Sequence, residues 1–390
     1  MNHTREHERV GKRIETTVQR IISGGIGLAR LGGKVLLVKG ALPGERVTAE
    51  IIREKRDYCE ASVLEVKDPS SSRIVPPCPW YGTCGGCDFQ FASPEYQIEL
   101  KRQMLIDALR RGTGIQLDPA DLPMASGSPW GYRRRVRLAR DPETGCLGFR
   151  KKQSHKVVPV DSCMVLHESL QAYVGSQGTE EQVALFAGDA HVSVGSRAAA
   201  VTLENSAGQR HTFALDARVF FQSNLTLMPA VIDFVQQHPC GGRAIDLYSG
   251  VGTFAAFLAD CYEEVTAVER DDRCLAYAAQ NLPGHIQFFT ESVESWMKQG
   301  HVGRIGRLVA DPPRSGLHAD AVRQIMRWKP ETIVYISCSP VTCFRDLKRF
   351  ISGGYRLDHL MGADFYPQTA HIECAAFLRR ATRSMTVSHS

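Results

Sequence analysis

Apolar and polar positions follow one pattern near the start of the chain and another toward its end. Up to residue 67 the apolar residues alternate in short runs, which glycines separate: IETTVQRII, GIGLARLGGKVLLVKGAL and ERVTAEIIREKRDYCEASVLEVKD. Alternation with period two between turn residues is typical of strands. We therefore predict a five-stranded barrel over residues 10–68, a shape that often binds oligonucleotides.

The middle of the chain has a mixed pattern. Apolar residues recur with helical spacing over about 95–111, within PEYQIELKRQMLIDALRR. Residues 130–215 alternate as strands again, and the spacing near 166–187 predicts a helix. We expect a β-rich central domain over residues 69–215.

From residue 216 onward, strand-like and helix-like segments alternate. AIDLY is followed by TFAAFLADC and EVTAVE by DRCLAYAAQNL, and the strand-like segments RLVAD, ETIVYIS and AAFLRR come later. This order predicts a mostly parallel, doubly wound α/β sheet over residues 216–390, with helices on both faces. Ligands of such sheets bind beyond the carboxyl ends of the strands.

Composition narrows the class of protein. The chain has 390 residues, of which 43% are hydrophobic and 23% charged, and it lacks an apolar run of the roughly 18 residues that would span a membrane. Because its charged N-terminus does not resemble a secretory signal, we expect a cytoplasmic protein. In a reducing compartment its twelve cysteines serve as core residues, metal ligands or catalytic thiols rather than in disulfides.

The net charge of +5 is modest, but basic residues crowd one stretch of the middle region. They are Arg133, Arg134, Arg135, Arg137, Arg140, Arg150, Lys151, Lys152, His155 and Lys156. Such a cluster can hold a nucleic-acid backbone, and the alternative is a solvated basic strand face.

The segment DLYSGVGTF predicts a strand, a tight glycine turn at Gly250 and Gly252, and a helix start. Such a loop suits a dinucleotide, S-adenosylmethionine or a plain turn. Glu269 ends the next strand about twenty residues later, where a carboxylate can bind the hydroxyls of a ribose. Because the full phosphate-binding pattern G-x-G-x-x-G is absent, S-adenosylmethionine is favoured over NAD.

Three further residues predict chemistry at the same sheet edge. Asp311 and Cys338 follow the strands RLVA and TIVYI, and Glu373 begins the last strand. A thiolate that attacks carbon 6 of uracil makes carbon 5 nucleophilic enough to accept a methyl group, and a base must then remove the carbon 5 proton. Cys338 is our candidate nucleophile and Glu373 our candidate base. The alternatives are a small buried residue for Cys338 and an ordinary strand-edge carboxylate for Glu373.

Taken together, these segments resemble the RNA uracil-5 methyltransferases, especially the bacterial 23S rRNA type with an N-terminal TRAM domain. The resemblance covers nearly the whole chain, through the front barrel and the segments CPWYGTCGGCDFQ, FFQSNL, DLYSGVGTF, DPPRSGL, YISCSPVTCFRDL and DFYPQTAHIE. It implies that Cys338 is the nucleophile and Glu373 the base. The positions that it places at the cofactor are Gln222, Tyr248, Gly250, Thr253, Glu269 and Asp311. Tyr248 stands where phenylalanine is frequent in the family, and Thr253 where asparagine is frequent.

Four cysteines have the spacing of a metal site. Cys78, Cys84 and Cys87 are spaced C-x5-C-x2-C, and Cys163 follows at a distance. Four thiolates suit zinc or a [4Fe-4S] cluster, and the spacing alone slightly favours zinc. The resemblance implies the iron-sulfur cluster. The C-x5-C gap is unlike the C-x3-C-x2-C of radical S-adenosylmethionine enzymes, so we expect no radical chemistry.

The expected partner is RNA, most directly 23S rRNA, with a transfer RNA loop as the alternative, and we expect a monomer. A non-catalytic RNA-binding protein would lack the nucleophile or the base, and both are present. A nicotinamide-dependent oxidoreductase would need a third glycine in the loop after the first strand, which is absent.

Overall fold

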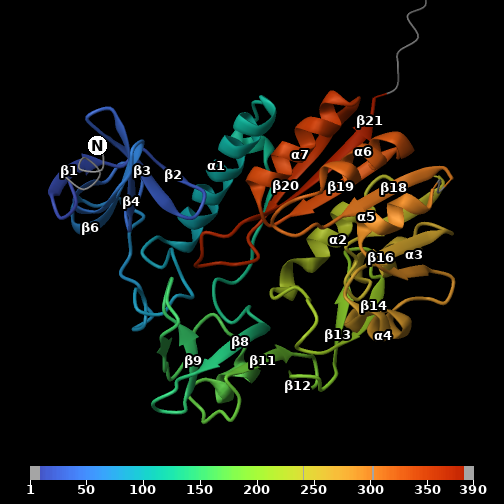
Figure 1. The fold of residues 1–390 in the computed structure, drawn as a ribbon, viewed down its shortest axis with the longest axis horizontal. Helices are drawn as coiled ribbons and strands as arrows, with labels where there is room; N and C mark the ends of the chain where they lie inside the picture. Colours follow the sequence, from blue (N-terminus) through green and yellow to red (C-terminus); the bar gives the residue numbers. More distant parts are fainter. Residues whose placement is uncertain (1–8, 240, 301–302, 382–390) are drawn as a thin grey trace, which may run out of the picture.

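The computed structural model describes residues 9–239, 241–300 and 303–381. Figure 1 shows three parts: a barrel in blue, a small middle sheet in green, and an α/β domain in yellow to red. Within the described ranges, no helix is both long and apolar enough to cross a membrane.

The N-terminal barrel contains six strands rather than the five we predicted. Its sheet has the order β1-β5-β6-β4-β3-β2. The run IETTVQRII is divided because Val18 N donates to Glu45 O, toward β5, whereas Gln19 N donates to Leu28 O in β3. The strands are β1 (Arg13–Thr17), β2 (Arg20–Ile22), β3 (Ile26–Leu31), β4 (Lys34–Lys39), β5 (Arg46–Glu54) and β6 (Tyr58–Asp68).

Helix α1 (Pro94–Thr113) confirms the predicted helical spacing and joins the barrel to the α/β domain. The Ser93 side chain accepts from Tyr96 N at the start, and Gly114, at φ 84°, ends the helix. Its apolar face, with Leu105 and Leu109, packs into the core that also contains helix α7 (Pro340–Ser352). Figure 1 shows α1 between the barrel and α7.

The middle region forms a five-stranded sheet of order β10-β9-β8-β11-β12 and a separate hairpin of β13 and β14. The helix that we predicted near 166–187 is wrong. A short 3-10 helix (Glu168–Tyr173) ends before Gly175, which adopts a φ of 75°, and Gln182–Ala187 is a strand paired with β8. The strands are β8 (Arg135–Arg140), β9 (Leu147–Arg150), β10 (Val157–Val158), β11 (Gln182–Ala187), β12 (Val192–Val194), β13 (Ala199–Glu204) and β14 (Arg210–Leu215).

The C-terminal sheet has eight strands in the order β17-β16-β15-β18-β19-β21-β20-β7. Strands β15 to β19 pair in parallel, and β21 runs antiparallel to both neighbours, so the predicted doubly wound α/β fold is confirmed. The strands are β7 (Met124–Ala125), β15 (Arg243–Leu247), β16 (Val265–Glu269), β17 (Gln287–Thr290), β18 (Ile305–Ala310), β19 (Thr332–Ser337), β20 (Tyr355–Ala363) and β21 (Glu373–Arg380).

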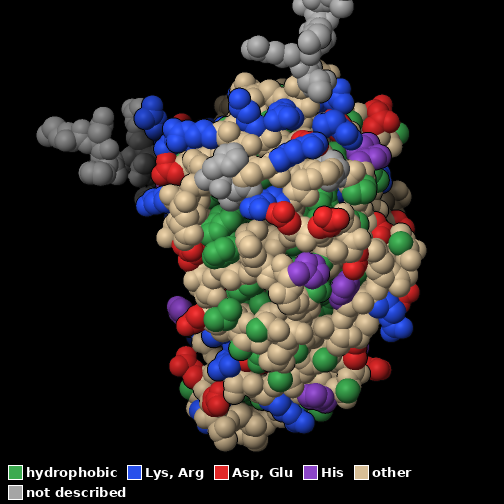
Figure 2. All heavy atoms as spheres, turned by 90° about the vertical axis from the view of Figure 1, so that its right-hand side faces the viewer, with side chains coloured by type: hydrophobic (Ala, Val, Ile, Leu, Met, Phe, Trp, Pro, Cys, Tyr) green, Lys and Arg blue, Asp and Glu red, His purple; other side chains and the backbone are tan. Residues whose placement is uncertain are grey.

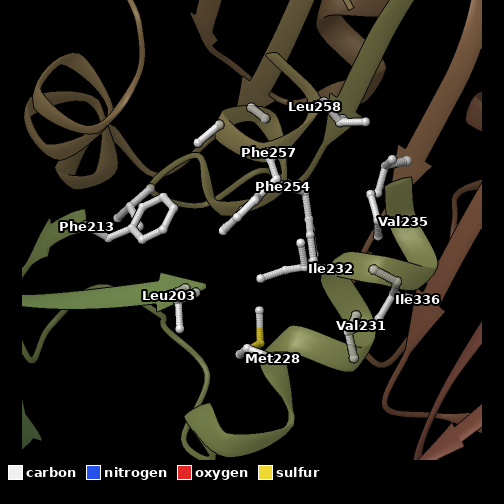
Figure 3. Close-up of a cluster of buried hydrophobic side chains, with 14 of the residues drawn as sticks. Leu203, Phe213, Met228, Val231, Ile232, Val235, Phe254, Phe257, Leu258 and Ile336 are labelled. Atoms are coloured by element: carbon white, nitrogen blue, oxygen red, sulfur yellow. The ribbon is translucent and has the colours of Figure 1, made fainter. Parts of the chain in front are cut away.

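Helices cover both faces of this sheet. Besides α7, they are α2 (Met228–Gln236), α3 (Thr253–Ala259), α4 (Asp272–Asn281), α5 (Val293–Trp296) and α6 (Ala319–Trp328), with 3-10 turns at Pro119–Asp121, Leu225–Leu227 and Met297–Gln299. Figure 3 shows the core around α2, where Ile232 lies toward Phe254 of α3 and Val231 lies near Ile336 of β19. Each such buried side chain contributes about 1.5–3 kcal/mol relative to an exposed one.

Segments from the middle of the chain take part in the C-terminal core. Strand β7 pairs with β20 at Met124 and Ala125, and Leu203 and Phe213 of the β13–β14 hairpin pack with the α2–α3 core. Because residues before 216 contribute to this sheet and its core, the structure does not divide the chain cleanly at that point. The domain boundaries at residues 69 and 216 remain predictions from the sequence. Figure 2 views the α/β domain from its outer side and shows Lys and Arg side chains gathered toward one end of that face, with acidic side chains among them.

Candidate active site

The carboxyl edge of the large sheet collects most of the predicted site residues. The glycine loop follows β15, Glu269 ends β16, Asp311 follows β18 and Cys338 follows β19. Because β21 is antiparallel, its first residue, Glu373, lies at that same edge. Neighbouring parallel strands end side by side, so residues far apart in the sequence meet there.

The glycine loop has a compact, strained backbone. Tyr248 adopts a φ of 63°, a left-handed conformation that is uncommon for a residue with a side chain. Gly252 has a φ of 90°, and a Cβ atom there would lie 2.6 Å from Leu282 Cδ2. Gly250 N donates to Glu269 Oε2 over 3.0 Å, which joins the loop to the end of β16. The left-handed backbone at Tyr248 and the lack of a side chain at Gly252 allow the backbone of the loop to lie close to the carboxyl edge of the sheet.

Two adjoining cavities lie at this edge and share Tyr248. The larger, of about 440 Å³, is lined by Tyr248, Glu269 and Ser292 with the loop after Pro313. The smaller, of about 50 Å³, is lined by residues that include Gln222, Gly250, Thr253 and Asp311. All six residues that we predicted at a cofactor therefore line one cavity or the other.

Buried polar atoms point to a polar ligand in these cavities. Among the described residues, Gln222 Oε1, Ser249 Oγ and Asp246 Oδ1 are buried without a hydrogen-bond partner in the protein. Buried polar atoms are normally paired, so the two of these atoms that belong to the lining of the smaller cavity, Gln222 Oε1 and Ser249 Oγ, call for a partner from a ligand. Burial also raises the pKa of Asp246 well above its ordinary value, and Asp311 and Glu269 raise it further. A ligand that carries a cationic group would suit this electronegative site.

Cys338 is only partly buried and lies among charged groups. Burial raises the pKa of its thiol, and Glu373 and Asp311 raise it further. Arg314 opposes them through its charge and through a side-chain hydrogen bond to Cys338. Arg314 is a site residue that our sequence analysis did not single out, although it belongs to the DPPRSGL segment that contains Asp311. Its guanidinium stabilises the thiolate form of Cys338.

Glu373 is a buried carboxyl that joins the catalytic and cofactor sides of the site. Gln222 Nε2 donates to Glu373 Oε2 over 3.3 Å. Burial and, to a smaller extent, the charge of Asp311 raise the pKa of Glu373 to about 8, against the opposing hydrogen bond from Gln222. Burial also raises the pKa of Asp311 to about 7. A carboxyl with a pKa near neutrality is suited to exchange a proton with a substrate.

The basic stretch of the middle region serves several different contacts. Arg134 pairs with Asp189 at 3.2 Å, Arg133 lines the pocket formed by the four predicted cysteine ligands, and Lys152 pairs with Asp88. The Arg135 guanidinium lies 5.8 Å from the centre of the Phe220 ring, which is 56% exposed beside the smaller cavity. The stretch is therefore not a uniform, free basic face.

Cys78, Cys84, Cys87 and Cys163 line one pocket, as their predicted role requires. Burial raises the pKa of Cys84 and Cys163, and that of Cys87 to about 12, to which Cys163, Cys84 and Cys78 also contribute. Thiols crowded in this way lose their protons when a cation joins them. Within the part of the chain that the structure describes, however, no three His, Cys, Asp or Glu side chains are grouped as the ligands of a metal ion.

Comparison with known proteins identifies the family. Residues 302–381 match the family described as tRNA (Uracil-5-)-methyltransferase, and residues 7–64 match the TRAM domain. The 23S rRNA (uracil(1939)-C(5))-methyltransferase RlmD of Shewanella amazonensis is 30% identical over 94% of this chain and 95% of its own length. That of Alkalilimnicola ehrlichii is 31% identical over 91% of this chain and 94% of its own.

A solved structure shares the overall fold. The tRNA (uracil-54, C5)-methyltransferase of Pyrococcus abyssi, in complex with S-adenosyl-L-homocysteine, superposes with a TM-score of 0.70. It is 23% identical and covers 93% of this chain and 99% of its own. Both relatives, from Shewanella and Alkalilimnicola, cover more than nine-tenths of the chain, and this chain belongs to the RNA (uracil-5-)-methyltransferase family.

Proposed function

We propose that this protein transfers a methyl group from S-adenosylmethionine to carbon 5 of a uridine in 23S rRNA. The observation that carries the proposal is the placement of a partly exposed thiol, Cys338, and a buried carboxyl, Glu373, beside cavities lined by the glycine loop. The 23S rRNA methyltransferase activity of the Shewanella and Alkalilimnicola relatives favours 23S rRNA, and a transfer RNA uridine is the alternative.

In the proposed reaction the Cys338 thiolate attacks carbon 6 of the uracil ring. The new S–C6 bond turns the ring into an enolate, whose carbon 5 would take the methyl group of S-adenosylmethionine, with S-adenosylhomocysteine as the leaving group. Glu373 then accepts the carbon 5 proton, the electrons of that C–H bond form the C5–C6 double bond, and the S–C6 bond breaks to return the thiolate. Arg314 favours the anionic form of the sulfur at the start and at the end of the cycle, against burial, Glu373 and Asp311, which keep the pKa of the thiol above its ordinary value.

S-adenosylmethionine supplies an electrophilic methyl group on a sulfonium. The proposed contacts to it are Gln222, Tyr248, Gly250, Thr253, Glu269 and Asp311. Both Glu269 oxygens already accept backbone N–H groups, from Gly250 at 3.0 Å and from Asp271 at 2.9 Å, so this carboxylate is rigidly oriented. Oε1 also accepts from Arg270 N at 2.8 Å, so it is Oε2 that keeps a lone pair for a ribose hydroxyl.

The uridine must leave its stack to react, because carbons 5 and 6 are attacked from the face of the ring. We propose that the barrel and the middle region grip the surrounding RNA while the base enters the site. Phe220 and Tyr366 are candidates for stacking on the base, since Phe220 lines the smaller cavity and Tyr366 lies near both Glu373 and Cys338. A cytoplasmic location and a monomeric state stay predictions of the sequence.

The substrate assignment predicts the outcome of a methylation experiment. Purified protein incubated with tritiated S-adenosylmethionine and separate pools of unmodified rRNA and tRNA should label 23S rRNA at a single uridine. Nuclease digestion and nucleoside analysis should recover the label as 5-methyluridine. Label in the tRNA pool alone would replace 23S rRNA with the alternative, and label in another nucleoside would reject carbon 5 methylation.

We further propose that the four cysteines hold a [4Fe-4S] cluster. In such a cluster each thiolate binds a different iron, so the four sulfurs are spread more widely than around one zinc ion, where every Zn–S distance is about 2.3 Å. The choice of the cluster over zinc follows the resemblance to the family, and Gln90 and Gly86 are the groups that lower the pKa of Cys87 and Cys84 and so favour their thiolate forms.

Anaerobically purified protein should contain about four iron and four sulfide per chain and absorb near 400 nm, as expected for this cluster type. Cys87→Ser should lower the iron content at least severalfold, whereas Cys146→Ser, at a partly buried cysteine outside the pocket, should not change it. One zinc per chain without sulfide would assign the site to zinc instead.

A further inference from the structure

The loop between β20 and β21, residues 364–372, leads directly into Glu373 and is held from outside its own sheet. In Figure 1 this red loop leaves the sheet and extends toward the chain between the barrel and α1. Its contacts there are with the residues that follow Cys87. Asp88 N and Phe89 N both donate to Gln368 O, over 2.8 and 3.0 Å, and Asp88 Oδ2 accepts from Ala370 N over 3.1 Å.

Gln97 of α1 fastens the same loop a second time. Its Oε1 accepts from Gln368 N, and its Nε2 donates to Gln368 Oε1, both over 3.0 Å. The same Nε2 lies within hydrogen-bond distance of Phe89 O and Ala92 O. Both glutamine side chains are about 1% exposed. Gln97 therefore connects the cysteine segment and the catalytic loop within one buried network.

The backbone of the loop needs this support. Gln368 has a φ of 67°, a left-handed conformation that costs free energy for a residue with a side chain. At the base of the loop, Lys101 pairs with Asp364 and also donates to Tyr366 O over 3.1 Å, with the lysine fully buried. The contacts around the loop hold Gln368 in an unfavourable conformation and bury the ion pair of Lys101 with Asp364. These contacts indicate that the loop is held in one defined position.

We propose that Asp88 and Gln97 are positioning residues, which hold the loop so that Glu373 faces the carbon 5 proton of the methylated ring. This inference rests on the proposed function. The other site residues lie outside the 364–372 loop. The glycine loop follows β15, Asp311 follows β18 and Cys338 follows β19. Loosening the loop therefore affects the step that Glu373 performs. In that step the carboxylate takes the C5 proton, the C5–C6 double bond forms and the Cys338 sulfur leaves carbon 6.

Asp88→Ala tests the proposal because it removes the acceptor for Ala370 N and leaves the backbone of the cysteine segment in place. RNA that carries tritium at carbon 5 of uridine and S-adenosylmethionine that carries carbon-14 in its methyl group report the two steps separately in one turnover. We expect methyl transfer at nearly the wild-type rate, tritium release slowed roughly 10- to 100-fold, and a methylated protein–RNA adduct that survives denaturation.

Two matched variants separate positioning from general damage. Asp88→Asn keeps an oxygen that can accept from Ala370 N, and it should restore tritium release to near the wild-type rate. Lys152→Ala removes the exposed partner of Asp88 and leaves the loop contacts intact, so both steps should stay unchanged. Gln97→Met, which removes the Gln368 contacts at similar volume, should repeat the Asp88→Ala result away from the cysteines.

Equal slowing of both steps in Asp88→Ala and Gln97→Met, or unchanged tritium release, would overturn the positioning role. The wild-type arm tests the proposed function independently. If wild-type protein forms no 5-methyluridine, the function fails, whereas normal wild-type turnover with no adduct in the variants rejects the positioning role alone.

Discussion

Cys338→Ala should abolish methyl transfer, with a loss of roughly 10⁴-fold or more in turnover. The loss should be so large because alanine offers no nucleophile for carbon 6, and without that addition carbon 5 cannot attack the methyl donor. The measurement is incorporation of tritiated methyl into unmodified rRNA by the purified variant. Binding of S-adenosylmethionine, measured by calorimetry, should stay near wild type, since no predicted cofactor contact changes.

Cys343→Ala is the matched control for this experiment. Cys343 is a buried thiol in α7, five residues after Cys338, and its removal should leave turnover within a fewfold of wild type. RNA with 5-fluorouridine at the target should trap wild-type protein as a covalent adduct, because fluorine cannot leave carbon 5 as a proton does. Wild-type turnover in Cys338→Ala, or adduct formation by that variant, would reject Cys338 as the nucleophile.

Glu373→Gln should separate the two halves of the reaction. The amide cannot accept the carbon 5 proton, so turnover should fall roughly 10²- to 10⁴-fold. Methyl transfer itself needs only Cys338 and the donor, and one methyl group per chain should still be incorporated. The product should accumulate as a protein–RNA adduct with natural uridine, seen on denaturing gels. Release of free 5-methyluridine RNA at the wild-type rate would assign the base to another residue.

The pH dependence of wild-type turnover provides a second test of Glu373. Because burial raises the pKa of this carboxyl to about 8, it is mostly protonated at pH 6 and cannot act as a base there. The raised pKa of the Cys338 thiol acts in the same direction, since the thiolate fraction also grows with pH. Turnover should therefore rise from pH 6 to pH 8.5, by up to about tenfold per unit for each of the two groups. In Glu373→Gln the slow residual loss of the carbon 5 proton should show no titration near pH 8, whereas methyl transfer should still rise with pH through Cys338.

Local patterns in the sequence were sufficient for the order and type of most elements. The alternation of strands and helices after residue 216 gave the parallel sheet, and the spacing over 95–111 gave α1. The errors arose where the partner of a segment decided its conformation. Residues 182–187 are a strand because β8 pairs with them, although their spacing also suits a helix. The run IETTVQRII became two strands because its halves pair with β5 and with β3.

The amino-acid sequence by itself determined which residues are candidates for the chemistry: a thiol and an aspartate after two neighbouring strands, a glutamate that begins a third, a glycine loop and four cysteines. Only the tertiary structure decided how these groups act on one another. The pKa of Glu373 near 8, the hydrogen bond from Arg314 to Cys338, and the attachment of the catalytic loop to Asp88 and Gln97 depend on contacts between distant segments. Burial and charge interactions depend on distances in space, and sequence spacing does not specify those distances.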